Sequence, residues 1–195
     1  MKKLLIAIIV FVNCSPIQAQ QEFTKQLTDA RTAYTGGKLD DSRFAMQQML
    51  LELDIITGKE VLKLLPVKML DQSQNAAADN VSGTSGFMGV VIHRDYGVDA
   101  KMINLEIISN TPLLTSINAL LSLPLLGNTG DMKVVKVSGY KALIQKSGSS
   151  DKPEFELQLP INSSLVTLRA PGYTRDQIIQ MANTLPLSQI AKTLQ

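Results

Sequence analysis

The chain has 195 residues, with 19 basic residues, 17 acidic residues, one histidine and one cysteine. A zinc or other transition-metal site needs several imidazole or thiolate ligands, so we expect no metal and no cofactor. At this length an ordinary hydrophobic core can stabilise one domain, or one domain with a small helical attachment.

The first nineteen residues have the order of regions that is typical of a secretory signal peptide. Two lysines precede an apolar run over residues 4–12, and polar, helix-breaking residues follow at 13–16. Ala19 supplies the small residue at the cleavage site, so we predict a mature chain that begins at Gln20 and is periplasmic or secreted. The apolar run is shorter than the roughly 20 residues of a spanning helix, and we expect no transmembrane segment in the mature chain.

An alternative is a lipoprotein anchored through Cys14, although Asn13 stands where such a site has a small residue. Cleavage before Gln20 removes two of the 19 basic residues and none of the 17 acidic residues, so the mature charges balance. We therefore expect no nucleic-acid partner, because phosphate binding depends on clustered Lys and Arg. Cleavage also removes the only cysteine, which excludes a disulfide in the mature chain.

Residues 20–70 are predicted to form a helical hairpin. Apolar residues three and four positions apart predict one helix over 22–34 and a second helix that follows Asp40. We expect Gly58 to interrupt the second helix and to leave a short third helical segment after it.

Residues 71–86 are poor in large apolar side chains and are predicted to be a linker. In the following segment, 87–195, the apolar period changes to two, which predicts a mostly antiparallel sheet domain with two helices. The predicted strands cover 87–96, 102–108, 132–137, 140–145, 155–159 and 165–169. One helix is predicted over 113–121, and the closing helix begins after Thr174, whose side chain can form a capping box with Gln177. The predicted fold class is α+β, with the helical hairpin followed by a sheet packed with helices.

The carboxyl-terminal half contains the runs 137–142 (Val-Ser-Gly-Tyr-Lys-Ala), 155–159 (Phe-Glu-Leu-Gln-Leu) and 181–186 (Met-Ala-Asn-Thr-Leu-Pro). In these runs, and in its order of elements, this half resembles small exported domains of the PsbP-like type. The resemblance implies an exported α+β domain and assigns no functional residue.

The candidate binding residues are His93, Arg94, Asp95 and Tyr96, because imidazole is the side chain that ordinarily titrates near neutral pH. The triplet His-Arg-Asp also occurs in the catalytic loop of protein kinases. Here, however, Ala100 stands where a kinase has asparagine, and no glycine-rich loop precedes the triplet. We therefore predict a strand end with His93 and Asp95 on one face, Arg94 on the other face and Tyr96 at the rim.

Other side chains that could carry chemistry are assigned to structure. The acidic and amide residues of 71–80 do not follow the order of a calcium-binding loop, and residues 82–87 lack the pattern of a serine nucleophile. Glu154 and Glu156 share one face of a predicted strand, as paired glycosidase carboxylates can. The chain has no tryptophan to form a sugar platform, so we expect an exposed strand face instead.

The export signal and the absence of a catalytic motif predict a non-enzymatic accessory protein that binds a protein partner or an apolar ligand. Its Leu, Ile and Met content is high enough to line a ligand pocket. A small hydrolase centred on His93 is an alternative of a different class. The third hypothesis is a structural component of the cell envelope, in which an exposed stripe of Phe44, Met49 and Leu53 docks a partner.

Overall fold

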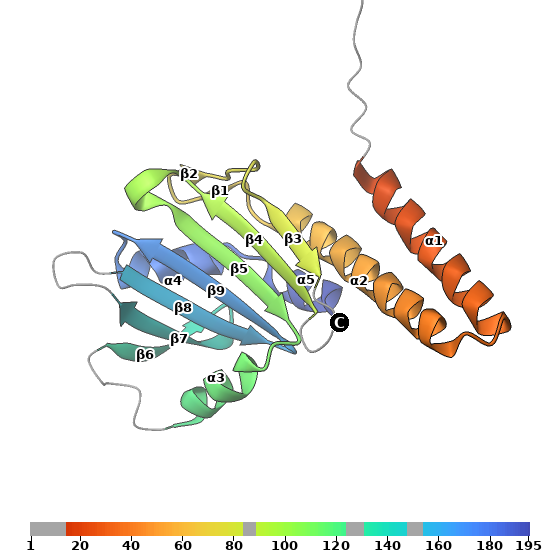
Figure 1. Cartoon of the computed structure of the whole chain (residues 1–195). Coiled ribbons are helices and arrows are strands. Elements are labelled where there is room, and N and C mark those ends of the chain that lie inside the picture. Colours follow the sequence, from red (N-terminus) through yellow and green to blue (C-terminus); the bar gives the residue numbers. More distant parts are fainter. Residues whose placement is uncertain (1–14, 84–88, 124–130, 148–153) are drawn as a thin grey trace, which may run out of the picture. The chain divides into compact units, whose positions relative to one another are not determined.

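The computed structural model of this chain describes residues 15–83, 89–123, 131–147 and 154–195, with side chains from Gln21 onward (Figure 1). These residues form two compact units, one that ends at Met49 and one that begins at Leu50. The first fourteen residues of the predicted leader, Cys14 included, lie outside the described residues, so cleavage and lipidation stay predictions. None of the described helices combines the length and the apolar character needed to cross a membrane.

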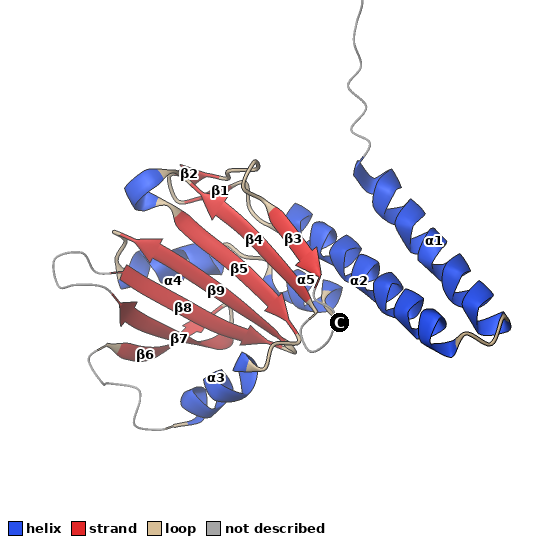
Figure 2. Ribbon diagram, viewed as in Figure 1, coloured by secondary structure: helices blue, strands red, loops and turns tan. Residues whose placement is uncertain are grey.

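The chain begins with helices α1 (Ser15–Thr35) and α2 (Leu39–Leu64), which confirm the predicted helical hairpin (Figure 2). Gly37 follows α1 with a φ of +73°, a left-handed conformation that glycine adopts without steric strain. The N–H of Lys38 then donates a hydrogen bond to the carbonyl oxygen of Ala33 at 2.9 Å, which closes the turn.

The prediction that Gly58 interrupts the second helix is wrong, because α2 continues to Leu64. Gly58 marks a close approach of α2 to the sheet. A Cβ atom at Gly58 would lie 2.6 Å from Cγ1 of Val81 and 2.6 Å from Cγ2 of Val90. Glycine costs about 1 kcal/mol relative to alanine in a helix interior. Close packing explains why this position has no side chain.

We expect Gly58→Ala to lower the free energy of unfolding by about 1–3 kcal/mol, because the new methyl group must displace packed valines. We expect the cost of this steric clash to exceed the free energy that alanine contributes through its higher helix propensity. Urea unfolding measures the effect. Adding Val81→Ala is expected to recover part of the loss, because Val81 is only half-buried. A Gly58→Ala protein as stable as the wild type would contradict the close approach.

The second unit contains a seven-stranded sheet in the order β3-β4-β5-β9-β8-β7-β6, which confirms the α+β class (Figures 1 and 2). All six neighbouring pairs are antiparallel. The strands are β3 (Asn80–Gly83), β4 (Val90–Tyr96), β5 (Ile103–Ser109), β6 (Met132–Val137), β7 (Tyr140–Ser147), β8 (Glu154–Ile161) and β9 (Ser164–Pro171). A single turn of 3-10 helix, η1 (Asp99–Lys101), connects β4 to β5.

The segment predicted as a linker, 71–86, is partly sheet. The short strands β1 (Lys68–Met69) and β2 (Gln72–Ser73) pair with each other, and β3 forms the edge of the main sheet beside β4. Val81 is the only large apolar side chain of β3, so the strand lacks the apolar alternation by which strands are predicted. Backbone pairing with β4, rather than its own side-chain pattern, holds β3 in the sheet.

Different helices pack against the two faces of the sheet (Figure 1). Helices α4 (Arg175–Asn183) and α5 (Leu187–Thr193), with the second half of α2, enclose the main hydrophobic core on one face. Helix α3 (Leu113–Ser122) lies on the other face, where its Ile117 and Leu121 pack against two sheet residues in a smaller cluster. Much of this second face is left for polar side chains.

Local sequence signals specify the start of α4. The N–H of Gln177 donates to Oγ1 of Thr174 at 3.3 Å, and the N–H of Thr174 donates to Oε1 of Gln177 at 2.8 Å. This is the predicted capping box, and it satisfies backbone donors that a helix start leaves without intrahelical partners.

The strands at the two edges of the sheet are β3 and β6. Lys133 and Lys136 of β6 are exposed. Lysine side chains on an edge strand oppose pairing with a strand of another molecule.

Candidate functional site

His93 and Asp95 lie together on the face of β4 that α4 and α5 leave uncovered. Nε2 of His93 is 3.0 Å from Oδ1 of Asp95. Asn104 stands opposite Asp95 on β5, and its Nδ2 donates a hydrogen bond to the same carboxylate oxygen at 2.6 Å. The predicted placement of His93 and Asp95 on one face is confirmed. Sequence reasoning missed Asn104, because its contact depends on the register between two strands.

The same row of side chains continues across β9 and β8. Asn104 pairs with Arg169, and Arg169 pairs with Glu156. Nε of Arg169 donates to Oε2 of Glu156 at 2.7 Å, while Nε2 of Gln158 donates to Oε1 of Glu156 at 2.5 Å. The hydrogen bond from Arg169 to Glu156 raises the pKa of the guanidinium, partial burial opposes this effect, and nearby carboxylates raise the pKa further. Glu156 is therefore part of an ion pair.

We call the polar side chains of this row and its neighbours the open face. They are His93, Asp95, Asn104, Glu106, Glu156, Gln158 and Arg169. All of these side chains except Glu106 form at least one hydrogen bond or ion pair with another member of the open face. In the part of the chain that the structure describes, no serine, threonine or tyrosine hydroxyl donates a hydrogen bond to His93, and no group of three or more metal-ligating side chains is found. The described open face thus offers polar contacts without a nucleophile beside the imidazole.

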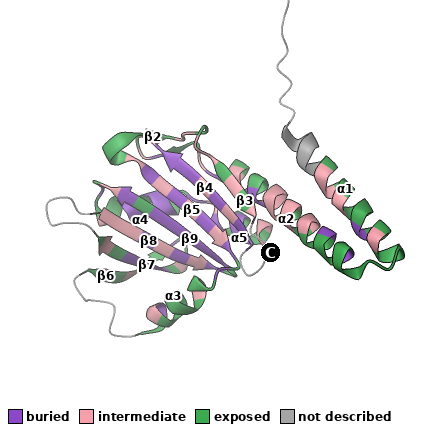
Figure 3. Cartoon of the chain, viewed as in Figure 1, coloured by how far each residue is buried: buried purple, intermediate pink, exposed green. Residues whose placement is uncertain are grey.

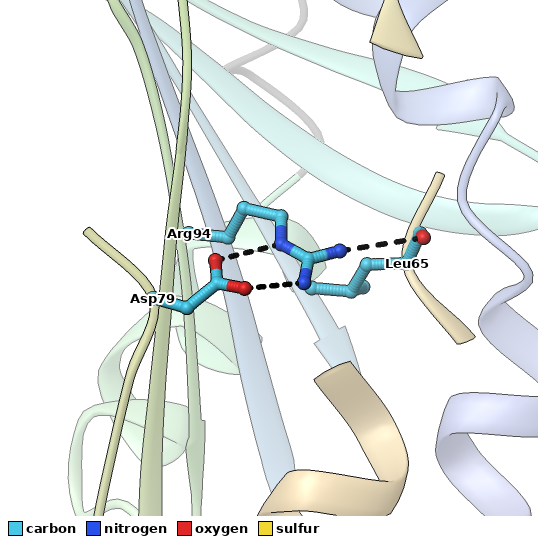
Figure 4. A network of polar contacts seen from close by, with 3 residues as sticks. All are labelled: Leu65, Asp79 and Arg94. Carbon is cyan, nitrogen blue, oxygen red and sulfur yellow. Dashed lines mark hydrogen bonds and ion pairs between the residues drawn. The ribbon is translucent and has the colours of Figure 1, made fainter. Parts of the chain in front are cut away.

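Arg94 lies on the opposite face of β4, as predicted, where it is buried in an ion pair (Figure 4). Its Nε and Nη2 donate to the two carboxylate oxygens of Asp79 at 2.8 and 2.6 Å. Nη1 donates to the carbonyl oxygen of Leu65, just beyond the end of α2, at 3.4 Å. The hydrogen bond with Asp79 raises the pKa of Arg94, against the effect of burial. Arg94 therefore joins three segments of the fold and is not exposed to a ligand.

Tyr96 is fully buried, so its predicted place at the rim of the sheet is wrong. It lies two residues after Arg94 on the same strand and therefore points to the same covered face. Burial raises the pKa of its hydroxyl to about 12, while the adjacent Arg94 partly opposes this rise. The hydroxyl has no hydrogen bond of good geometry among the described residues. Of the four candidate binding residues, only His93 and Asp95 reach the open face.

We expect Asp79→Ala to lower the free energy of unfolding by about 3–5 kcal/mol, because it leaves the buried Arg94 charge without its partner. The double variant Asp79→Leu with Arg94→Met is expected to lose much less, since it removes both charges. Urea unfolding of the double variant and of its two single variants measures the coupling energy between the two side chains. If the losses of the two single variants add up to the loss of the double variant, the two side chains do not form a stabilising pair.

Tyr96 is expected to make stability depend on alkaline pH. Folding raises its pKa from 10.0 to about 12, so the folded state favours the neutral hydroxyl. The contribution of Tyr96 to the free energy of unfolding is therefore complete below pH 10 and is lost as the pH rises toward 12. Full ionisation removes up to about 3 kcal/mol. Thermal unfolding between pH 8 and pH 12 measures this loss, and Tyr96→Phe is expected to reduce it. An unchanged pH profile in Tyr96→Phe would refute the assignment.

A second candidate surface lies on the helical hairpin, where most residues of α1 and of the first half of α2 are exposed or half-buried (Figure 3). Ala30 of α1 and Ser42 and Ala45 of α2 are buried, and Oγ of Ser42 donates to the carbonyl oxygen of Ala30 at 3.0 Å. Small residues at such a contact let two helices approach closely. Several larger apolar side chains of the two helices are exposed.

Seven of the eleven exposed large hydrophobic residues in the described part of the chain lie on these two helices. Five of them belong to the unit that ends at Met49, and we call these five the hairpin surface: Leu27, Tyr34, Leu39, Phe44 and Met46. Phe44 of the predicted stripe belongs to it, Met49 is half-buried, and Leu53 is an exposed residue of the second unit. Sequence reasoning missed Leu39 and Met46. The buried small residues were the available signal, since they mark the side of α2 that faces α1.

Comparison with protein-family models, with curated proteins and with solved structures found no match to this chain.

Proposed function

We propose that the protein is an exported, non-enzymatic accessory protein that binds a protein partner through the hairpin surface. The packing of the hairpin carries this proposal. Small residues are buried between the two helices, while large apolar residues are exposed to solvent. Soluble proteins rarely expose apolar side chains that are gathered in this way unless the patch binds something. The predicted signal peptide supports the exported location.

The size of the hairpin surface supports a protein as its partner. Its five side chains are each between 46% and 64% exposed. Aromatic side chains bury on the order of 150–250 Å² each, so these five half-exposed side chains present roughly 500 Å² together. A specific protein–protein interface buries about 800 Å² on each partner. The hairpin surface therefore supplies more than half of the area that one side of a stable interface needs.

The distribution of side chains favours a protein partner over a small apolar ligand. Ligands of that kind are held in concave sites that surround most of their surface. The hairpin surface follows the outside of two helices, where another protein can cover it with its own apolar side chains. The open face of the sheet presents side chains that are largely paired with one another, so it offers less unsatisfied bonding capacity to a ligand.

A photo-crosslinking residue in place of Met46 tests this proposal in the host organism. We expect irradiation to join the protein to another polypeptide, because Met46 is covered when the partner is bound. The same residue in place of Lys59, an exposed polar position of α2, serves as the matched control. The yield of crosslinked product is read from its mass on a denaturing gel and by mass spectrometry.

The proposal fails if Met46 and Lys59 give the same products in the same yield. It also fails if adding Leu39→Glu to the Met46 crosslinker leaves the product unchanged, since a charge within an apolar contact is expected to weaken binding at least tenfold. The identity of the joined polypeptide does not affect this test.

A further inference from the structure

The charged groups of the open face are paired with one another, with Glu106 as the exception. This carboxylate is half-buried in the middle of β5, and it forms no hydrogen bond or ion pair with a described residue. The guanidinium of Arg169, on the neighbouring strand β9, is bonded to Glu156 instead. A carboxylate that loses part of its hydration without gaining a partner is unfavourable in the isolated protein.

Thr167 lies directly opposite Glu106 on β9 and is only 6% exposed. Its side chain points to the open face, because its neighbours Val166 and Leu168 belong to the main core on the other face. Its hydroxyl forms no hydrogen bond with a described residue, and unlike the hydroxyl of Tyr96 it is not completely enclosed. A buried hydroxyl group normally has a partner, so this one points to a ligand on the open face.

His93 lies on the other side of Glu106, directly opposite it on β4. Nε2 of His93 is 3.0 Å from Oδ1 of Asp95. When Nε2 donates its proton to this carboxylate, the other ring nitrogen of the neutral imidazole is a hydrogen-bond acceptor. His93, Glu106 and Thr167 therefore form a row of three acceptors across three neighbouring strands.

An apolar row runs beside these acceptors on the same face. Val91 of β4 pairs with Ile108 of β5, and Ile108 pairs with Leu165 of β9. Leu165 packs under α3, whereas Val91 and Ile108 are half-buried and belong to neither hydrophobic cluster of the described residues. The three acceptors thus border an apolar strip that the described helices leave without a packing partner.

The charge of the open face favours a cationic ligand. Its members include the three carboxylates of Asp95, Glu106 and Glu156 and the single guanidinium of Arg169, so two negative charges are in excess when His93 is neutral. The acceptors lie on the surface of a sheet, across which a protein segment can lie. A small molecule, in contrast, is usually held in a site that surrounds it.

We propose that the open face is a second interaction surface, and that it binds a lysine side chain of a protein partner. The lysine ammonium group donates hydrogen bonds to Glu106, Thr167 and His93. Its aliphatic stem lies over Val91 and Ile108. Lysine fits better than arginine, because an ammonium group can donate to acceptors on three strands, whereas a guanidinium prefers the paired oxygens of one carboxylate. This inference goes beyond the proposed function, since it does not involve the hairpin surface.

Titration of the isotope-labelled protein with Nα-acetyl-lysine methylamide, followed by NMR, tests the inference. We expect saturable shifts of the backbone amides of Val91, Glu106 and Thr167, with a dissociation constant on the order of 1–10 mM for a single side chain. The same compound with an acetylated ε-amino group has no charge and is expected to give no saturable shift.

Two matched variants test the role of Glu106. Glu106→Gln is expected to weaken binding at least tenfold, because it removes the charged acceptor. Glu154→Gln removes the same charge from the same face of the sheet, on β8, which β9 separates from β5. This control is expected to change the dissociation constant less than roughly twofold, since Glu154 lies outside the row of acceptors.

Thr167→Val tests the buried hydroxyl. This substitution keeps the size of the side chain, so we expect binding to weaken roughly three- to tenfold while the free energy of unfolding does not fall. Urea unfolding of the variant measures the second quantity. Unchanged binding in Thr167→Val would exclude the hydroxyl from the site and contradict the geometry proposed here.

No saturable shift at concentrations up to roughly 50 mM would overturn the inference. An equal response to the acetylated compound, or equal weakening by Glu106→Gln and Glu154→Gln, would do so as well. In the host organism, a photo-crosslinking residue in place of Val91 is expected to join a polypeptide, and Glu106→Gln is expected to abolish this product. Amine binding in solution without such a product would show that the ligand is a free amine and not a protein.

Discussion

The ion pair between Arg94 and Asp79 is the constraint that organises the sheet unit. It joins β4 to the segment before the edge strand β3 and, through the Leu65 carbonyl oxygen, to the end of α2. These three groups are brought together from positions up to 29 residues apart in the chain. A buried charge cannot easily exchange its partner for water. The end of α2, whose apolar residues pack in the core, and the polar edge of the sheet are therefore fixed together.

The elements that were predicted correctly are those that a local sequence pattern specifies. The α4 capping box depends on two side chains three residues apart, and β5 shows a clean alternation of apolar and polar residues. The helical hairpin and the antiparallel pairing of β4 with β5 were predicted on the same grounds.

What the sequence did not reveal depends on contacts between distant segments. Asn80–Gly83 is a strand because β4 pairs with it, and Gly58 has no side chain because two valines approach it. In the candidate site, alternation placed His93 and Asp95 correctly. The position of Asn104 beside Asp95 required the strand register. Tyr96 was misplaced because it stands just before the turn at Gly97, which predicted a place at the rim, whereas its side chain is enclosed by the core.

The two candidate surfaces differ in how far their own side chains satisfy one another. On the open face, Asp95 and Glu156 each make one contact within their own strand and one with the next strand, so these carboxylates are paired within one molecule. On the hairpin, Met46 is exposed, and small residues fill the contact between α1 and α2. An antiparallel sheet commonly has one polar, solvated face. The hairpin surface is the feature that ordinary folding does not explain.

The lysines on β6 limit the kinds of assembly that this protein can form. A second molecule that approached β6 edge to edge in the same manner would bring Lys133 and Lys136 against their own counterparts. Like charges directly opposite each other disfavour such strand pairing. Growth into a continuous sheet would require a different contact, in which β6 of one molecule pairs with β3, the other edge, of the next. The charged edge at β6 is a poor template for that strand as well, so one of the two edges that a growing sheet needs is protected.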